Sequence, residues 1–272
     1  MNERRVVMSR GEEVSSETRE IAVGQQPIVV VCVPEVIGRV PTGSSLSDTS
    51  GGIGEANVND LPHLTRDQIV SRLRPGERIL DVGCGSGEIA RLMHARGCAV
   101  VGIELSPEKA AKARAFCDEV LVGNIEAMPL AFEPGSFDVI VLSNILEHLN
   151  NPVATLRRLA PLLRPTGRAF VDLPNVAHWG VRLRLLRGRW DYEDAGILDR
   201  THLRFYTRKT AREMLEQTGF EILEQDIIPD VPLLRYKQRW AQLNYHVARL
   251  RPDLFSTEML FVVHPRKTTA SR

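Results

Sequence analysis

The stretch Arg78-Ile-Leu-Asp-Val-Gly-Cys-Gly-Ser-Gly-Glu88 decides the fold of this chain. Its first part, Arg78 to Val82, predicts a short buried strand. Three glycines then mark a tight turn: Gly83, Gly85 and Gly87. From Glu88 to Ala95 the apolar residues recur with helical spacing. A strand, a glycine turn and a helix in this order predict a nucleotide-type pocket at the carboxyl end of the strand, because glycine lets the backbone approach a ligand closely.

Two acidic residues narrow the choice of ligand. Asp81 lies at the end of the first strand, and Glu104 ends a second strand predicted from Ala99 to Ile103. A dinucleotide fingerprint reads G-x-G-x-x-G, whereas this turn reads G-x-G-x-G after an acid. A carboxylate at Asp81 repels a pyrophosphate and suits a cationic or ammonium-bearing ligand. Glu104 can accept hydrogen bonds from both hydroxyls of a ribose.

Five blocks of the sequence resemble, in order and spacing, those of the class I S-adenosylmethionine-dependent methyltransferases. The blocks are Asp81-Val-Gly-Cys-Gly-Ser-Gly87, Val101-Gly-Ile-Glu-Leu-Ser106, Gly123-Asn-Ile-Glu-Ala-Met-Pro129, Phe137-Asp-Val-Ile-Val-Leu-Ser-Asn-Ile-Leu-Glu-His-Leu149 and Leu163-Arg-Pro-Thr-Gly-Arg-Ala-Phe170. The resemblance covers residues 64–265 and implies a Rossmann-like, doubly wound α/β fold. Its sheet has seven strands, the last of them antiparallel and beside the sixth. The implied cofactor is S-adenosyl-L-methionine, with S-adenosyl-L-homocysteine as the product.

The resemblance also implies which residues bind the cofactor. They lie in the glycine turn and after the strand ends: Asp81, Gly83, Cys84, Gly85, Gly87, Glu104, Leu105, Asn124, Ile125, Glu126, Ser143, Asn144 and His148. The family usually has an aspartate where Asn124 stands. An asparagine can accept from the adenine amino group through its carbonyl oxygen, and the backbone amide of Ile125 would serve the neighbouring ring nitrogen. A plain turn at this loop is the alternative.

Composition excludes several classes of protein. The chain has 272 residues, of which 43% are hydrophobic and 25% charged, as in an ordinary globular domain with an extra segment. Its formal net charge of +1 gives no case for a nucleic-acid partner. It contains no apolar run near the roughly 20 residues of a membrane span, so no membrane partner is expected. The four cysteines lack C-x-x-C spacing and indicate reduced thiols in a cytoplasmic protein.

The sequence divides into an amino-terminal extension, residues 1–60, and a methyltransferase domain, residues 61–272. Met1 to Gln26 is polar, without sustained periodicity, and predicts an irregular tail. Pro27 to Val33 predicts a strand with no assigned place in the domain. Gly38 to Asn59 has the composition of a linker, with a lid over the cofactor as the functional alternative.

Two insertions depart from a minimal domain. Residues 176–207 are rich in aromatic and ionisable residues and predict a cap that faces a small-molecule acceptor. The acceptor-binding candidates there and just before are Asn175, His178, Trp179, Asp199, Arg200 and His202. Residues 229–257 predict an amphipathic helix, with Leu233, Leu234, Trp240, Leu243, Val247 and Leu250 on its apolar side. Such a face packs against the domain or forms a homodimer.

Methyl transfer from a sulfonium needs alignment above all, and a general base helps when the acceptor is a hydroxyl. The base candidates are His148, His178 and His202. Each has a structural alternative as a hydrogen-bonded histidine. No metal site is predicted, since no cluster of metal-binding carboxylates is evident.

Two other functions stay open. An NAD-dependent oxidoreductase is disfavoured by the absence of G-x-G-x-x-G in the turn. A non-catalytic partner protein would keep the pocket and bind cofactor without methylating an acceptor. The leading hypothesis is methyl transfer to a hydroxyl of a sugar or secondary metabolite.

Overall fold

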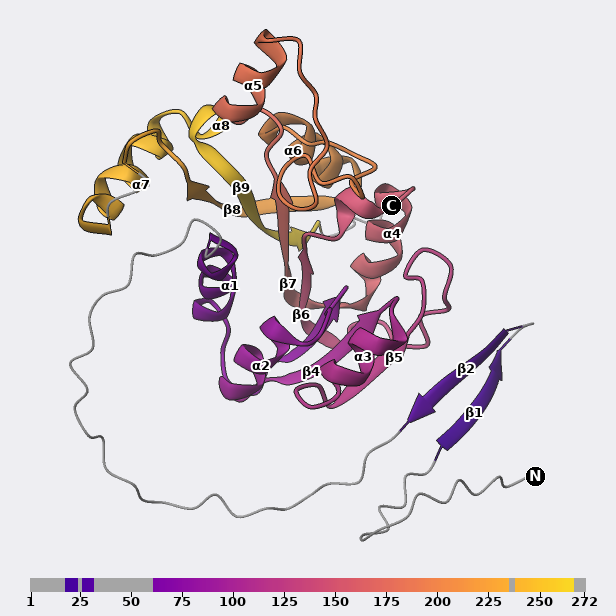
Figure 1. Cartoon of the computed structure of the whole chain (residues 1–272). Helices are drawn as coiled ribbons and strands as arrows, with labels where there is room; N and C mark the ends of the chain where they lie inside the picture. Colours follow the sequence, from indigo (N-terminus) through magenta and orange to yellow (C-terminus); the bar gives the residue numbers. More distant parts are fainter. Residues whose placement is uncertain (1–17, 24–25, 32–60, 235–237, 267–272) are drawn as a thin grey trace, which may run out of the picture. The chain divides into compact units, whose positions relative to one another are not determined.

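The computed structural model describes residues 18–23, 26–31, 61–234 and 238–266. The chain forms two units, residues 1–47 and residues 48–272 (Figure 1). The first unit contains an antiparallel pair of strands, β1 (Thr18–Val23) and β2 (Gln26–Val31). The predicted strand at residues 27–33 is confirmed as far as Val31, and the predicted linker or lid lies outside the described residues.

The prediction of an irregular tail is wrong for Thr18–Val23, which forms β1. Its residues pair one to one with those of β2, from Thr18 opposite Val31 to Val23 opposite Gln26. The segment contains two charged residues, Arg19 and Glu20, so its sequence lacks the apolar pattern that predicts a strand. The pairing supplies the backbone hydrogen bonds that the local pattern does not reveal.

The second unit is built on a seven-stranded sheet with the order β5-β4-β3-β6-β7-β9-β8. Its strands are β3 (Arg78–Val82), β4 (Ala99–Glu104), β5 (Glu119–Val122), β6 (Phe137–Ser143), β7 (Leu163–Pro174), β8 (Phe220–Pro229) and β9 (Ser256–Pro265). The first five are parallel, and β9 lies between β7 and β8, antiparallel to both. This confirms the predicted sheet with its antiparallel last strand. Strand β7 runs through Thr166 and Gly167.

Eight helices surround the sheet in the described part of the second unit: α1 (Leu61–Ser71), α2 (Glu88–Ala95), α3 (Pro107–Ala113), α4 (Pro152–Leu159), α5 (Trp179–Leu186), α6 (Arg208–Gln217), α7 (Ala241–Leu250) and α8 (Pro252–Phe255). Three 3-10 turns accompany them: η2 (Leu146–His148), η3 (Ala160–Leu162) and η4 (Gln238–Trp240). None of the described helices combines the length and the apolar composition that a membrane span requires.

The two faces of the sheet carry separate apolar cores, because successive residues of a strand point to opposite faces. Leu80 of β3 belongs to the core that α4 and α6 cover, while Ile79 belongs to the core that α1 and α2 cover. Burial on both sides explains why the parallel strands read as continuous apolar runs. With both faces covered, the carboxyl ends of β3, β4, β6 and β7 form one edge, where the site lies.

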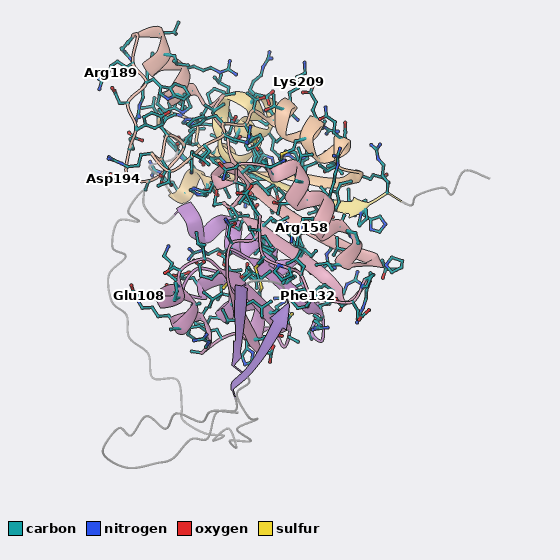
Figure 2. The ribbon with its side chains drawn as sticks, turned by 90° about the vertical axis from the view of Figure 1, so that its right-hand side faces the viewer. Glu108, Phe132, Arg158, Arg189, Asp194 and Lys209 are labelled. Carbon is teal, nitrogen blue, oxygen red and sulfur yellow. The ribbon has the colours of Figure 1, made fainter. Side chains whose placement is uncertain are left out.

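The segment between β7 and β8 contains α5, a long irregular stretch and α6, which agrees with the predicted insertion. Figure 2 shows that this segment, marked by Arg189 and Asp194, lies away from α3, marked by Glu108. The predicted amphipathic helix in the second insertion is shorter than expected, since α7 begins at Ala241. Its buried residues are Asn244 and Ala248, whereas Leu243 and Leu250 are exposed. These two leucines therefore do not pack within the chain, and the homodimer alternative for this face stays a prediction.

Candidate cofactor and acceptor site

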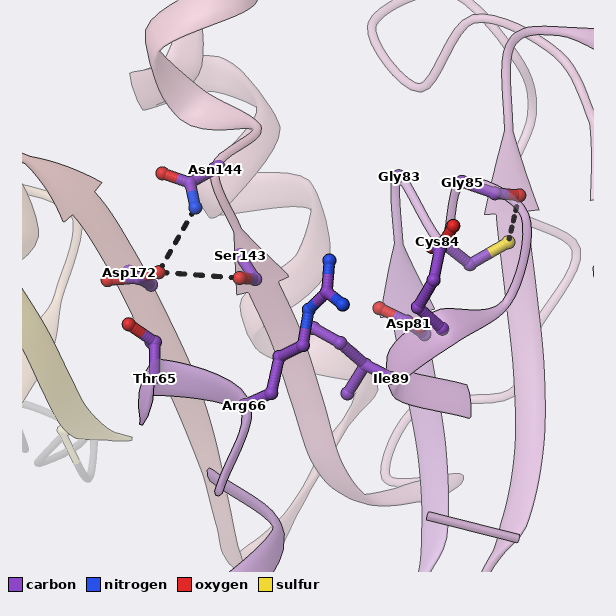
Figure 3. Close-up of a pocket in the computed structure, with 11 residues that line it drawn as sticks. Thr65, Arg66, Asp81, Gly83, Cys84, Gly85, Ile89, Ser143, Asn144 and Asp172 are labelled. Carbon is purple, nitrogen blue, oxygen red and sulfur yellow. Dashed lines mark hydrogen bonds between the residues drawn. The ribbon is translucent and has the colours of Figure 1, made fainter. Parts of the chain in front are cut away.

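A cavity of about 140 Å³ opens where β3, β6 and β7 end (Figure 3). The residues that line it are Thr65, Arg66, Asp81, Gly83, Cys84, Gly85, Glu88, Ile89, Ser143, Asn144 and Asp172. Six of them were predicted to bind the cofactor: Asp81, Gly83, Cys84, Gly85, Ser143 and Asn144. The structure thus brings the glycine turn and the end of the fourth strand of the large sheet into one pocket. These roles stay predictions.

The glycine turn requires glycine for two separate reasons. Gly83, Gly85 and Gly87 have φ angles of 76°, 59° and 88°, in the left-handed region that side chains rarely adopt. In addition, a Cβ atom at Gly87 would lie 3.0 Å from the Cα atom of Ala113, so α3 could not stay in place. The turn therefore holds the start of α2 close to α3.

Asp81 is the most constrained carboxylate of the cavity. Its side chain is buried, and its Oδ2 atom has no hydrogen-bond partner among the residues that the structure describes. Burial, and then the carboxylates of Glu88 and Glu104, raise the pKa of Asp81 to about 7. A buried carboxylate without a partner is costly unless a cation compensates it. The position fits the positively charged end of S-adenosylmethionine.

Glu104 binds the glycine turn. Its Oε2 atom accepts a hydrogen bond of 2.9 Å from the amide of Gly85, and its Oε1 atom accepts one of 2.8 Å from the amide of Ser106. Each oxygen keeps a second lone pair, so the carboxylate can still receive the two hydroxyls of a ribose. The next residue, Leu105, is 67% exposed, so its side chain can make an apolar contact with a flat ring.

The loop after β5 has a well-defined local structure. The Oδ1 atom of Asn124 accepts from the amide of Glu126 at 2.9 Å, and the side chain of Ile125 is buried. The Glu126 carboxylate accepts from the amides of Asn150 and Asn151. Glu126 thus joins its loop to the segment before α4, and Asn124, which is exposed, remains the polar side chain that can face an adenine.

A carboxyl pair that the sequence analysis missed lies at the end of β7. Asp172 is fully buried, and its Oδ2 atom accepts from Asn144 Nδ2 at 3.2 Å and from Ser143 Oγ at 3.4 Å. The carboxyl group of Glu258 lies close enough to interact with it electrostatically, and Thr65 donates to that carboxyl group at 2.5 Å. Burial raises the pKa of both acids, and the charge of Glu258 raises that of Asp172 further.

His148 and His202, two of the predicted bases, come together in the structure. Their ring centroids are 4.8 Å apart, and the carboxylate of Glu147 lies beside them. Burial lowers the pKa of His202 below its ordinary value. Phe205 contacts His202 on one side and Trp190 on the other. Trp190, Phe205 and His202 thus form a chain of ring contacts that ends at His148.

The third predicted base, His178, has a different environment. It is buried, with Nε2 2.9 Å from Asp230 Oδ2, while its Nδ1 atom accepts from the amide of Gly180 at 3.2 Å. Trp179 donates its indole hydrogen to the backbone oxygen of Asp230 at 3.0 Å. Both side chains therefore connect the start of α5 to the loop after β8, and neither lines the cavity.

The other acceptor-binding candidates also have partners within the protein. The Nδ2 atom of Asn175 donates to the backbone oxygen of Ser256 at 2.9 Å, and its side chain is fully buried. The carboxylate of Asp199 accepts from the amide and the hydroxyl of Thr201. Arg200 is exposed and pairs with Asp194 at 2.6 Å. Their predicted contact with an acceptor stays a prediction. The hydrogen bonds of Asn175 and Asp199 could not be read from the sequence.

Comparison with known sequences agrees with this geometry. A family model described as a methyltransferase domain matches residues 58–225, more than half of the chain. The ubiquinone biosynthesis O-methyltransferase of Xylella fastidiosa is 38% identical over 188 residues, which cover 58% of this chain and 76% of the relative. The protein of the same name from Aeromonas salmonicida is 27% identical over 186 residues, 65% of this chain and 78% of the relative. The matches to the Xanthomonas campestris proteins of this name span about half of those relatives, 48%.

Solved structures share the fold at low identity. An S-adenosylmethionine-dependent methyltransferase from Archaeoglobus fulgidus superposes with a TM-score of 0.51 at 17% identity, covering 76% of this chain and 99% of the other. The [4+2]-cyclase SpnF also superposes with a TM-score of 0.51, at 20% identity, covering 75% of this chain and 81% of the other. The fold alone thus accommodates more than one reaction. The family match decides the class, and the chain belongs to the methyltransferase domain family as an S-adenosylmethionine-dependent methyltransferase.

Proposed function

We propose that this enzyme methylates an oxygen atom of a small molecule, with a hydroxyl group of a sugar or a secondary metabolite as the acceptor. The single observation that carries the proposal is the cavity between Asp81 on the cofactor side and Asp172 on the other side. Oxygen as the accepting atom is supported by the names of the relatives, which are O-methyltransferases.

The residues present fit the cofactor. The buried, unpaired Oδ2 atom of Asp81 would pair with its positive charge, and Glu104 would hold its ribose. When bound, the cofactor supplies a methyl group that is already activated by the sulfonium. The task of the protein is then to align an acceptor oxygen with that methyl group and to exclude competing nucleophiles.

Asp172 is placed to take the proton of the acceptor hydroxyl. It lines the cavity at the end of β7, and the two other acids that line it, Asp81 and Glu88, lie on the cofactor side. Its raised pKa makes its ionised form a stronger base than an ordinary aspartate. Ser143 and Asn144 fix the orientation of its carboxyl group through Oδ2.

The test is a transfer assay with methyl-labelled S-adenosylmethionine and a panel of acceptors that differ only in the accepting atom. Matched sugars and phenols with a hydroxyl or an amino group at one position serve this purpose. The expected result is a methyl ether together with S-adenosylhomocysteine, and its loss in the Asp81→Asn variant. Methylation of the amino compounds but not of the hydroxyl compounds would overturn the choice of oxygen.

Asp172→Asn tests the proton acceptor separately. This variant should bind S-adenosylhomocysteine as the parent does, while kcat for a hydroxyl acceptor falls by about 100-fold, in the range of general-base catalysis. Unchanged kcat in a folded variant would exclude Asp172 as the base and return that role to His148 or His202.

A further inference from the structure

Three side chains next to the site present metal-binding atoms to one another. They are Glu147 and His148 from η2 and His202 from the cap, and one atom of each lies within 4.8 Å of the other two. The two histidines are far apart in the sequence, so the cap has to fold onto η2 to form the cluster. Backbone hydrogen bonds secure this contact, since the amides of Leu203 and Arg204 donate to the carbonyl oxygen of Glu147.

The orientation of both imidazole rings is fixed through the same nitrogen. Nδ1 of His202 lies 3.1 Å from the backbone oxygen of Ile197, and Nδ1 of His148 lies 3.2 Å from that of Thr201. A carbonyl oxygen can only accept, so each Nδ1 carries the hydrogen and each Nε2 keeps its lone pair. Histidines that bind metals typically donate their other ring hydrogen in this way.

The carboxylate of Glu147 has no ion pair shorter than 3.9 Å in the described structure. Its side chain is 0% exposed, and neither of its oxygens accepts a hydrogen bond from another described residue. The nearest positive candidate, Nε2 of His202, lies 3.9 Å from Oε1, too far for a hydrogen bond. Buried polar groups are otherwise almost always satisfied, so this carboxylate points to a ligand that supplies positive charge.

We propose that Glu147, His148 and His202 bind a divalent transition metal ion, with Zn²⁺ as the best match. Two imidazole nitrogens and one carboxylate oxygen are a ligand set found in zinc enzymes, and they also suit Fe²⁺. Three protein ligands leave positions open for water. The prediction of no metal site from sequence is thereby replaced, because His202 reaches the cluster only through the folded cap.

The alternative is a metal-free cluster in which Glu147 holds a proton. Burial, together with the nearby carboxylates of Glu258 and Asp199, raises the pKa of Glu147 to about 8. A protonated Glu147 would be neutral at pH 7, but its hydrogen would still need an acceptor. The metal-bound and the metal-free cluster differ in metal content, which can be measured without any acceptor or turnover.

The experiment uses the full chain after removal of metals with a chelator and dialysis. Calorimetric titration with Zn²⁺ should show one tight site, and Co²⁺ should give the visible absorption bands of a bound ion. The variants Glu147→Gln and His202→Gln should weaken Zn²⁺ binding by at least about 100-fold, more than the loss of an outer hydrogen-bond partner causes. The control is His94→Gln, an exposed histidine at the end of α2, which should bind Zn²⁺ like the parent.

Thermal unfolding separates loss of the site from loss of the fold. A bound ion should raise the Tm of the parent and of His94→Gln, and leave the Tm of His202→Gln unchanged. The proposal is overturned if the folded parent binds no Zn²⁺ or Co²⁺, or if His202→Gln binds as tightly as the parent. Binding of S-adenosylhomocysteine is measured in parallel, so failure of this proposal is distinguishable from failure of the proposed function.

Discussion

The carboxylate of Glu104 accepts a hydrogen bond of 2.9 Å from the backbone amide of Gly85. The acid that ends β4 therefore shapes the glycine turn after β3, in addition to its predicted contact with the ribose. Because one side chain makes both contacts, its removal should change the conformation of the turn and weaken binding of the ligand.

Replacement of Glu104 by Gln should weaken binding of S-adenosylhomocysteine by about 10- to 100-fold, since hydrogen bonds to a charged group contribute roughly 1.5–3 kcal/mol. Calorimetric titration measures the change. Glu108→Gln, an exposed acid in the first turn of α3, is the matched control and should bind normally. Equal affinities for both variants would show that Glu104 does not contact the ligand.

Asp81 should make cofactor binding depend on pH. Because its pKa is about 7 in the free protein, a fraction of it is protonated at pH 6.5, and a cationic ligand selects the ionised form. The affinity for S-adenosylmethionine should therefore rise from pH 5.5 to pH 7 and level off above it. Calorimetry in buffers of different ionisation enthalpy should detect release of a proton on binding at pH 6.5. Asp81→Asn should abolish that release.

The same residue should lower stability as the pH rises. Between its pKa near 3.9 in the unfolded chain and about 7 in the folded protein, the folded state binds one more proton than the unfolded state. The contribution of Asp81 to the free energy of unfolding therefore decreases across this window and is lost above pH 7. Denaturant melts at pH 5.5 and 7.5 should show a smaller decrease for Asp81→Asn than for the parent.

Gly87→Ala should destabilise the protein more than Gly76→Ala. Both glycines have positive φ angles, 88° and 83°, so each alanine carries a backbone cost of roughly 1–2 kcal/mol. At Gly76 nothing lies within 4 Å of the added Cβ atom, whereas at Gly87 it meets the backbone of α3 at 3.0 Å. The steric clash should add about 1–3 kcal/mol. Urea melts measure the free energy of unfolding of both variants. Equal losses of stability would mean that α3 shifts away from the added Cβ atom at no cost.

His178→Ala should lower the free energy of unfolding by about 1.5–3 kcal/mol, the range for a hydrogen bond to a charged group. Its partner is Asp230, 2.9 Å away, and both side chains are buried. A double-mutant cycle with Asp230→Ala should show a coupling above 0.5 kcal/mol. The affinity for S-adenosylhomocysteine should stay at the parental value, because His178 does not line the cavity. A large loss of affinity with unchanged stability would place His178 in the site instead.

The sequence predicts well what depends on local pattern. Apolar runs mark the parallel strands, and the glycine turn after β3 places Asp81 and Glu104 at one edge of the sheet. It predicts poorly what depends on contacts between distant segments. Asp172 was overlooked because an acid inside an apolar strand carries no motif, and only the folded sheet shows that Glu258 of β9 lies beside it.

The surroundings of the three candidate histidines also depend on contacts between distant segments. His148, His178 and His202 are all base candidates from the sequence, yet the fold gives them different surroundings. His178 is buried against Asp230, while His148 and His202 meet Glu147. An irregular segment such as residues 187–206 has no period from which its path over the sheet could be inferred, so no spacing rule could have separated them.

The position of β9 between β7 and β8 has a consequence for synthesis on the ribosome. Strand β8 pairs only with β9 in the described sheet, and β9 follows it after α7 and α8. Until residues 256–265 leave the exit tunnel, β8 has no neighbour and one edge of β7 stays open. Closure of the sheet is therefore a late event, and a nascent chain stalled before β9 would expose two unpaired edges to chaperones or to aggregation.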